Sequence, residues 1–214
     1  MTQIAPCLTT ENIDTYNSLV EKYSPFAKRV HIDISDGEFA PTLLLDPEQL
    51  TWPGNWQVDI HAMVKRPSEY IDKLIALKPH TIIFHVEAEE DLVPHIQKLK
   101  SVGIKAGVAL LKKTVPKTHA EIIEQADHVL IFCGELGRYG GEADLMQLEK
   151  IRLVRGIHPE VEIGWDGGAS PENAFSLSQG SVNVINVGGA ISKASDPVAV
   201  YEKMVSEADK QGVI

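Results

Sequence analysis

Three histidine and aspartate motifs stand at the ends of apolar runs. His31 and Asp33 lie two residues apart in a β-branched segment, Asp59 and His61 repeat the pair in the next one, and Asp166 ends a later run. Side chains two apart on a strand share a face, so each pair points to one side of its strand. Imidazole and carboxylate groups brought together can bind a transition metal or move protons, whereas a single pair can simply satisfy itself by a hydrogen bond.

Alternating strands and helices would bring these motifs together. Eight short apolar segments read as strands, at residues 4–8, 29–34, 57–64, 80–86, 104–110, 129–133, 161–165 and 182–187. Helical patterns follow them, including one over 142–155 and another that begins at the cap-like Ser170-Pro171-Glu172. Apolar, β-branched strands that alternate with helices are typical of a parallel sheet covered by helices. The pattern predicts a single (β/α)8 barrel, a TIM barrel, as one domain over residues 1–214.

A doubly wound open sheet is the structural alternative, but no G-x-G-x-x-G follows the first strand. Barrel enzymes place their chemistry at the C-terminal ends of the strands. The motif residues lie at or near such ends, together with His85, Glu87 and Cys133. This concentration of polar residues predicts an enzyme.

Composition limits the partners. A net charge of −10 over 214 residues argues against a nucleic acid or an anionic membrane surface as the main partner. The two cysteines have no CxxC spacing, which suits a reducing compartment. The first residues show no basic segment followed by an apolar one, and no apolar run approaches membrane length. We therefore expect a cytoplasmic protein that binds neither membrane nor nucleic acid.

Seven motifs, in order along the chain, resemble those of the ribulose-phosphate 3-epimerase family. They are Ile4-Ala5-Pro6, His31-Ile32-Asp33 with Asp36-Gly37, Asp59-Ile60-His61-Ala62-Met63-Val64, Phe84-His85-Val86-Glu87-Ala88, the glycines 137, 140 and 141, Asp166-Gly167-Gly168, and Gly188-Gly189-Ala190-Ile191. The resemblance implies inversion of C3 of a ketose phosphate, D-ribulose 5-phosphate to D-xylulose 5-phosphate in this family. We also expect a homo-oligomer.

The resemblance implies one divalent metal ion held by four residues of this chain, His31, Asp33, His61 and Asp166. Mixed imidazole and carboxylate ligands suit Zn, Fe(II), Mn or Co. Inversion of a carbon next to a ketone needs two acid/base groups and a positive charge beside the negative enediolate oxygens. By the resemblance, Asp33 and Asp166 are the two acid/base groups. His85 and Glu87 are expected to support the metal ligands rather than bind metal, or else only to fill the barrel interior.

Glycines in the loops after the last three strands are expected to hold the phosphate through backbone N–H groups. These glycines are Gly140, Gly141, Gly167, Gly168, Gly188 and Gly189. Any one of these glycine pairs, considered alone, could instead be needed only for a turn that requires a positive φ. Cys7 and Met63 are expected to line the sugar site.

The chain departs from the family pattern around the sugar. Cys7 stands where the family usually has serine, and of three methionines over the site only Met63 is kept, with Ser35 and Phe132 at the other positions. These departures keep other substrates open, such as a hexulose 6-phosphate. A barrel that binds a phosphorylated sugar without turning it over is a further alternative. Decarboxylase- or aldolase-like relatives carry an Asp-x-Lys-x-x-Asp run, which is not found here.

The loop 134–141 differs most from the family, because it is longer and contains Arg138 and Tyr139. Its glycines make it flexible enough to act as a lid over the site. Arg138 could either clamp the phosphate or point to solvent.

Overall fold

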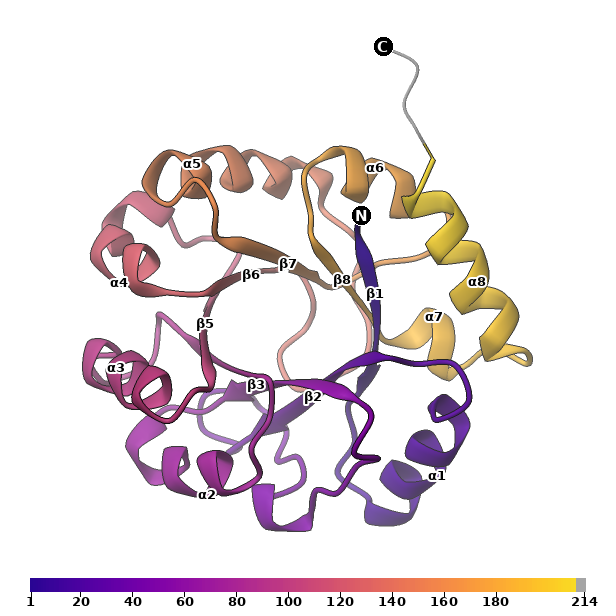
Figure 1. Cartoon of the computed structure of the whole chain (residues 1–214), viewed down its shortest axis with the longest axis horizontal. Helices are drawn as coiled ribbons and strands as arrows, with labels where there is room; N and C mark the ends of the chain where they lie inside the picture. The colour runs from indigo at the N-terminus through magenta and orange to yellow at the C-terminus, as the bar shows by residue number, and fades with distance from the viewer. Residues whose placement is uncertain (211–214) are drawn as a thin grey trace.

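Eight parallel strands close into a barrel in the order β1 to β8, which confirms the predicted (β/α)8 fold (Figure 1). The computed structural model describes residues 1–210. The strands are β1 (Gln3–Leu8), β2 (Arg29–Ser35), β3 (Gln57–Met63), β4 (Thr81–His85), β5 (Lys105–Leu110), β6 (His128–Phe132), β7 (Glu162–Asp166) and β8 (Val184–Val187). Because all eight run in one direction, their C-terminal ends meet at one mouth.

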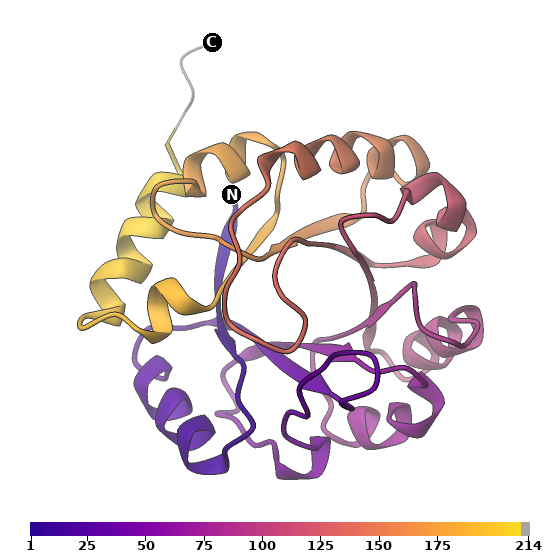
Figure 2. The same ribbon diagram turned by 180° about the vertical axis from the view of Figure 1, so that it is seen from behind.

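Helices surround the barrel and bury the outer faces of the strands. They are α1 (Ile13–Tyr23), α2 (Ile71–Ala76), α3 (Val93–Ser101), α4 (Ala120–Gln125), α5 (Glu149–Ile157), α6 (Ala174–Gln179), α7 (Gly189–Ser192) and α8 (Pro197–Ala208). Viewed from the other side, the segment after β6 crosses the mouth of the barrel (Figure 2). Among residues 1–210, no helix has the length and apolar character needed to cross a membrane.

Two helices begin later than the sequence pattern indicates. The helix predicted over 142–155 starts with a 3-10 turn at Leu145–Leu148 and becomes α-helical only at Glu149, because Asp144 caps the turn by accepting from the Met146 N–H. Ser170 does not cap a helix. Its N–H donates to Asn173 Oδ1, and this turn delays α6 to Ala174. Side chains that bond nearby backbone groups favour turns over helix continuation.

The base of the barrel holds a buried charge cluster. Arg29, on β2, donates from Nε to Asp59 Oδ2 at 2.6 Å and from its two Nη atoms to Glu162 at 2.9 and 2.7 Å. Glu162 Oε2 also contacts His128 Nδ1 at 2.8 Å. Arg29 and Asp59 are 3% and 1% exposed, so the Asp59 carboxylate depends on Arg29 for its neutralisation.

Apolar side chains lie between the base and the mouth on β4, β5 and β6. Ile83, Ala109 and Leu130 pack together inside the barrel. Ile83 lies two residues before His85 on β4, and Leu130 lies two residues after His128 on β6. Since inward-facing positions alternate along a strand, this side of the interior has an apolar middle, whereas on β2 and β3 the polar positions run without a break from Arg29 and Asp59 to His31 and His61.

We expect Arg29→Met to lower the free energy of unfolding by about 3–5 kcal/mol, because it leaves the buried Asp59 carboxylate unpaired. Urea denaturation measures the change. Arg152→Met is the matched control: Arg152 pairs with Glu149 in an exposed ion pair, so its loss should leave stability unchanged. Equal stability of the two variants would contradict the structural role of Arg29.

The acid sensitivity of the fold should depend on Glu162. Burial alone would raise the pKa of Glu162, but hydrogen bonds from Arg29 and His128 outweigh it and hold the pKa well below its usual range. This carboxylate therefore stabilises the fold fully above about pH 4.3, the ordinary glutamate pKa, and the contribution is lost as the pH falls toward the lower folded value. Glu162→Gln should lower stability at neutral pH and flatten its decline in acid. Parallel stability curves for the two proteins would contradict this.

Candidate functional site

Four side chains converge at the mouth of the barrel. His31 and Asp33 on β2, His61 on β3 and Asp166 on β7 each offer one ligand atom, and these atoms all lie within 4.8 Å of one another. Asp33 and His61 are register partners on adjacent strands, which places their side chains together. All but Asp166 are buried. The structure thus assembles the four residues that the sequence predicts as metal ligands.

A chain of contacts runs outward from His61. Its Nδ1 lies 2.9 Å from Asp33 Oδ1, and its Nε2 lies 2.9 Å from His85 Nε2. His85 Nδ1 lies in turn 3.1 Å from Glu87 Oε2. Glu87 is anchored by the Leu111 N–H, which donates to Oε1 at 2.9 Å. The two residues predicted to support the ligands therefore contact His61 in series.

This chain sets the orientation of the imidazole rings. Burial lowers the pKa of His85 to about 4, so its ring is neutral. A carboxylate only accepts hydrogen bonds, which assigns the proton to His85 Nδ1 and leaves its Nε2 to accept from His61 Nε2–H. In neutral His61, the Nδ1 lone pair then faces the Asp33 carboxylate. Two acceptors at 2.9 Å repel unless a cation or a proton lies with them.

His31 shows the same need for positive charge. Its Nε2 lies 3.3 Å from Asp33 Oδ1 and 3.4 Å from Asp166 Oδ2, yet within residues 1–210 neither ring nitrogen has a hydrogen-bond partner. Burial disfavours the charged ring, but the carboxylates of Asp166 and Asp33 outweigh it and raise the pKa of His31 to about 10. A buried imidazole without a partner, two carboxylates and a second imidazole fit a divalent transition metal.

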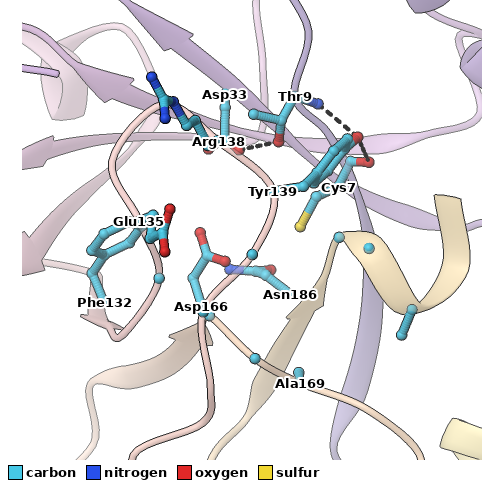
Figure 3. A pocket seen from close by; sticks show the side chains of 18 of the residues that line it. Cys7, Thr9, Asp33, Phe132, Glu135, Arg138, Tyr139, Asp166, Ala169 and Asn186 are labelled. Carbon is cyan, nitrogen blue, oxygen red and sulfur yellow. Dashed lines mark hydrogen bonds between the residues drawn. The ribbon is translucent and has the colours of Figure 1, made fainter. Parts of the chain in front are cut away.

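A cavity of about 250 Å³ opens over this cluster (Figure 3). Its lining includes Asp33, Asp166 and every residue predicted to contact substrate, namely Cys7, Met63, Gly140, Gly141, Gly167, Gly168, Gly188 and Gly189. Burial raises the pKa of the Cys7 thiol well above its usual value, and the charges of Asp166 and Asp33 add to the shift. Cys7 therefore presents a neutral thiol to the cavity.

The glycines of the cavity have packing roles of their own. A Cβ on Gly167 would lie 2.1 Å from Gly134 N, and one on Gly168 would lie 2.1 Å from Ala143 N. Both residues also have positive φ, at 115° and 67°. Close approach of the loops after β6 and β7 thus requires these two glycines. Gly189 differs, because a Cβ there would meet only the end of Lys193, at 4.0 Å.

Two of the three positions at which the family has a methionine over the site line the cavity, namely Met63 and Phe132. Met63 Sδ accepts from the Gly137 N–H at 3.2 Å, which ties the 134–141 loop to β3. The Phe132 ring lies beside His61 and also lines the cavity, with ring centroids 5.5 Å apart. Ser35 instead donates to the Thr42 carbonyl and is not part of the lining.

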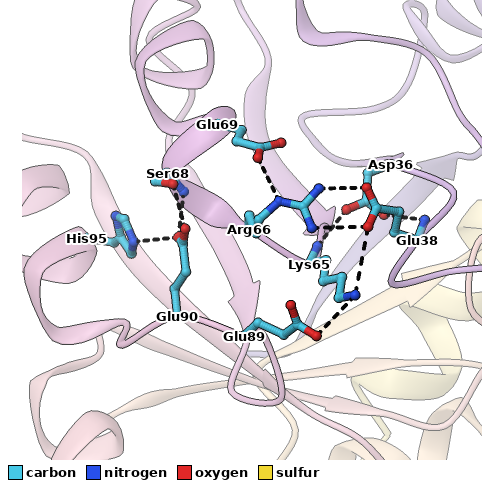
Figure 4. A network of polar contacts seen from close by, with 9 residues as sticks. All are labelled: Asp36, Glu38, Lys65, Arg66, Ser68, Glu69, Glu89, Glu90 and His95. Atoms are coloured by element: carbon cyan, nitrogen blue, oxygen red, sulfur yellow. Dashed lines mark hydrogen bonds and ion pairs between the residues drawn. The ribbon is translucent and has the colours of Figure 1, made fainter.

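The loop after β2 is anchored by Asp36. Its Oδ1 accepts from the Glu38 and Phe39 N–H groups, both at 2.8 Å, and its Oδ2 accepts from the Lys65 N–H. Arg66 adds a surface network by donating to Glu38 and to Glu69 (Figure 4). The anchored loop places the Phe39 ring against His85, with centroids 4.7 Å apart.

Arg138 is exposed on the 134–141 loop and lines the edge of the cavity. Its Nε donates to Thr42 Oγ1 at 3.3 Å. The guanidinium therefore contacts the loop after β2 in this structure.

Sequence reasoning missed two polar residues of the cavity. Thr9 Oγ1 donates to Asp33 Oδ2, although Thr9 follows β1 and reads as a helix start. Asn186, on β8 beside Asp166, is 2% exposed, and within residues 1–210 its Oδ1 has no partner. Its position as a lone polar residue in an apolar strand is the signal that could have found it.

Comparison with known proteins places the chain among sugar-phosphate enzymes. The model of the ribulose-phosphate 3-epimerase family matches residues 3–192. Ribulose-phosphate 3-epimerase of Helicobacter pylori is 30% identical over 204 residues, covering 91% of this chain and 92% of that protein. The Bacillus subtilis ribulose-phosphate 3-epimerase is 27% identical over 217 residues, covering 97% and 98%.

Solved structures at lower identity share the barrel. The 3-hexulose-6-phosphate synthase of Salmonella typhimurium superposes with a TM-score of 0.71 at 14% identity, covering 97% of this chain and 98% of that one. Phosphoribosyl anthranilate isomerase of Thermococcus kodakaraensis gives 0.63 at 13%, covering 99% and 100%. These likenesses show the fold alone. The family match over nearly the whole length is more specific, and by it the chain belongs to the ribulose-phosphate 3-epimerase family, isomerases that act on sugar phosphates.

Proposed function

We propose that this protein is a metal-dependent epimerase that inverts C3 of a ketose phosphate, converting D-ribulose 5-phosphate to D-xylulose 5-phosphate. The observation that carries the proposal is the cluster of His31, Asp33, His61 and Asp166, of which the two aspartates line the cavity. The same four residues would hold one divalent ion, of Zn, Fe(II), Mn or Co. When bound, this ion would supply positive charge for the oxygens of the enediolate.

The two aspartates divide the proton transfers. One carboxylate removes the C3 proton from one face of the carbon, and the other returns a proton to the opposite face. Asp33 comes from β2 and Asp166 from β7, and they enter the cavity from different sides (Figure 3). Which of them acts first as base depends on the direction of reaction.

The glycine lining would bind the phosphate and fix the substrate. Gly140, Gly141, Gly167, Gly168, Gly188 and Gly189 all line the cavity. Backbone N–H groups at such glycines can approach an anion closely, so a phosphate site needs no basic side chain, which suits a protein of net charge −10. Closure of the 134–141 loop over the sugar would exclude water from the reacting carbon.

Incubation of metal-loaded protein with a panel of ketose phosphates in D₂O tests the proposal. Loss of the C3 proton signal together with formation of the C3 epimer supports it. A hexulose 6-phosphate is the second candidate substrate, because Ser35 and Phe132 replace two of the methionines that the family has over the site. A larger rate on that compound would favour it instead. Binding without proton exchange would assign the barrel to sugar-phosphate binding alone, although both aspartates are in place.

Assembly and location rest on the family resemblance and the cysteine pattern. Cys7 and Cys133 are both buried and free, in keeping with a reducing compartment. We infer that the enzyme acts as a homo-oligomer in the cytoplasm.

Purified protein should hold about one divalent ion per chain, and His31→Ala or His61→Ala should lose it, since each removes a ligand. Elemental analysis of dialysed protein measures the content. His158→Ala, at the end of α5 and outside the cluster, should keep the metal. Stoichiometric metal in both ligand variants, or none in the wild type after loading, would refute the four-ligand assignment.

Asp33→Asn and Asp166→Asn should each reduce epimerisation by orders of magnitude, since proton transfer on one face cannot invert the carbon. Proton exchange at C3 in D₂O gives a separate readout. One of the variants is expected to exchange the C3 proton without forming the epimer. Full epimerase activity in either variant would exclude the two-aspartate mechanism.

A further inference from the structure

The side chain of Tyr139 fastens the 134–141 loop to the ends of two strands. Its Oη donates to the Cys7 carbonyl and accepts from the Thr9 N–H, each at 2.9 Å (Figure 3). Its ring lies against Gly188, where a Cβ would come within 2.6 Å of it. The Tyr139 hydroxyl is thus held by the backbone of Cys7, in β1, and of Thr9, just beyond it. The Tyr139 ring packs closely on Gly188, just beyond β8.

Thr9 continues this contact to a reacting group. Its hydroxyl donates to Asp33 Oδ2, and its side chain is nearly buried. The other oxygen, Asp33 Oδ1, faces His61 Nδ1 at 2.9 Å and His31 Nε2 at 3.3 Å. The Thr9 hydroxyl therefore fixes which carboxylate oxygen faces the imidazoles and which faces the cavity. A valine at this position would leave that rotation free.

We infer that Thr9 and Tyr139 are positioning residues, through which closure of the 134–141 loop holds Asp33 in its working orientation. The inference rests on the proposed function, in which Asp33 transfers a proton at C3. Gly140 and Gly141 directly follow Tyr139 and line the cavity. An anion that orders these two glycines also holds Tyr139 on the end of β1, so phosphate binding and the orientation of Asp33 are linked.

Kinetics of metal-loaded variants test the Thr9 contact. Thr9→Val keeps the shape and the backbone N–H but removes the hydroxyl, so kcat should fall about 10–100-fold with KM little changed. Thr9→Ser restores the donor and should recover most of the rate. Tyr139→Phe should also lower kcat, and the double variant Thr9→Val/Tyr139→Phe should lose less than the product of the two single losses, because both act through one contact.

Trypsin cleavage after Arg138 tests the Tyr139 contact without catalysis. Arg138 is exposed on the loop, so cleavage there reports its opening. Tyr139→Phe should be cut about fivefold faster than the wild type, and inorganic phosphate should protect the wild type more than the variant. Tyr201→Phe, whose ring packs on Phe26 away from the loop, is the matched control and should be cut at the wild-type rate.

The outcomes separate the two proposals. Wild-type kcat in Thr9→Val, or wild-type cleavage in Tyr139→Phe, overturns the positioning role. If the wild-type protein epimerises no ketose phosphate, the proposed function fails. The positioning role of Thr9 and Tyr139 is then tested by the Mn²⁺ affinity of the Thr9 variants and by trypsin cleavage after Arg138. Thr9→Val should bind Mn²⁺ about tenfold more weakly than Thr9→Ser. Equal affinities in these two variants overturn it.

Discussion

The site depends on an excess of acceptors in a buried volume. Asp33 and Asp166 bring two carboxylates to the ring nitrogens of His31 and His61, and no more than 4.8 Å separates the ligand atoms. Such a group of acceptors is stable only with positive charge among them. Other features of the mouth serve this constraint. The contacts from His61 through His85 to Glu87 fix the imidazole tautomers, and the Thr9 hydroxyl fixes the rotation of Asp33.

The barrel supplies this arrangement at little conformational cost. The ligands lie on strands held on both sides by parallel neighbours, so only side-chain rotations remain to be fixed. The loops that line the rest of the cavity are less constrained, and the 134–141 loop is held by contacts from Met63 and Tyr139. In the proposed reaction the proton-transferring groups would thus lie on rigid strands, while contacts with the sugar and its phosphate would come mainly from loops.

The sequence predicts the strand-borne part of the site well and the loop-borne part poorly. Alternation along a strand fixes the face of His31 and Asp33, and eight apolar segments are enough to predict the barrel that gathers them. The contacts of Thr9 with Asp33 and of Tyr139 with Cys7 span 24 and 132 residues and leave no local pattern. Side-chain bonds to the backbone, such as that of Asp144, likewise decided where α5 begins.

The apolar layer of Ile83, Ala109 and Leu130 has a consequence for how this barrel can change. On β4 to β6 these side chains lie between base and mouth, whereas on β2 and β3 Arg29 and Asp59 lie one inward position from His31 and His61. Substitutions at Arg29 or Asp59 would therefore change both the stability of the base and the charge next to His31 and His61. Base and mouth are thus separable on the β4–β6 side of the barrel and coupled on the β2–β3 side, so an engineer who redesigns the base for stability would start at His128 rather than at Arg29.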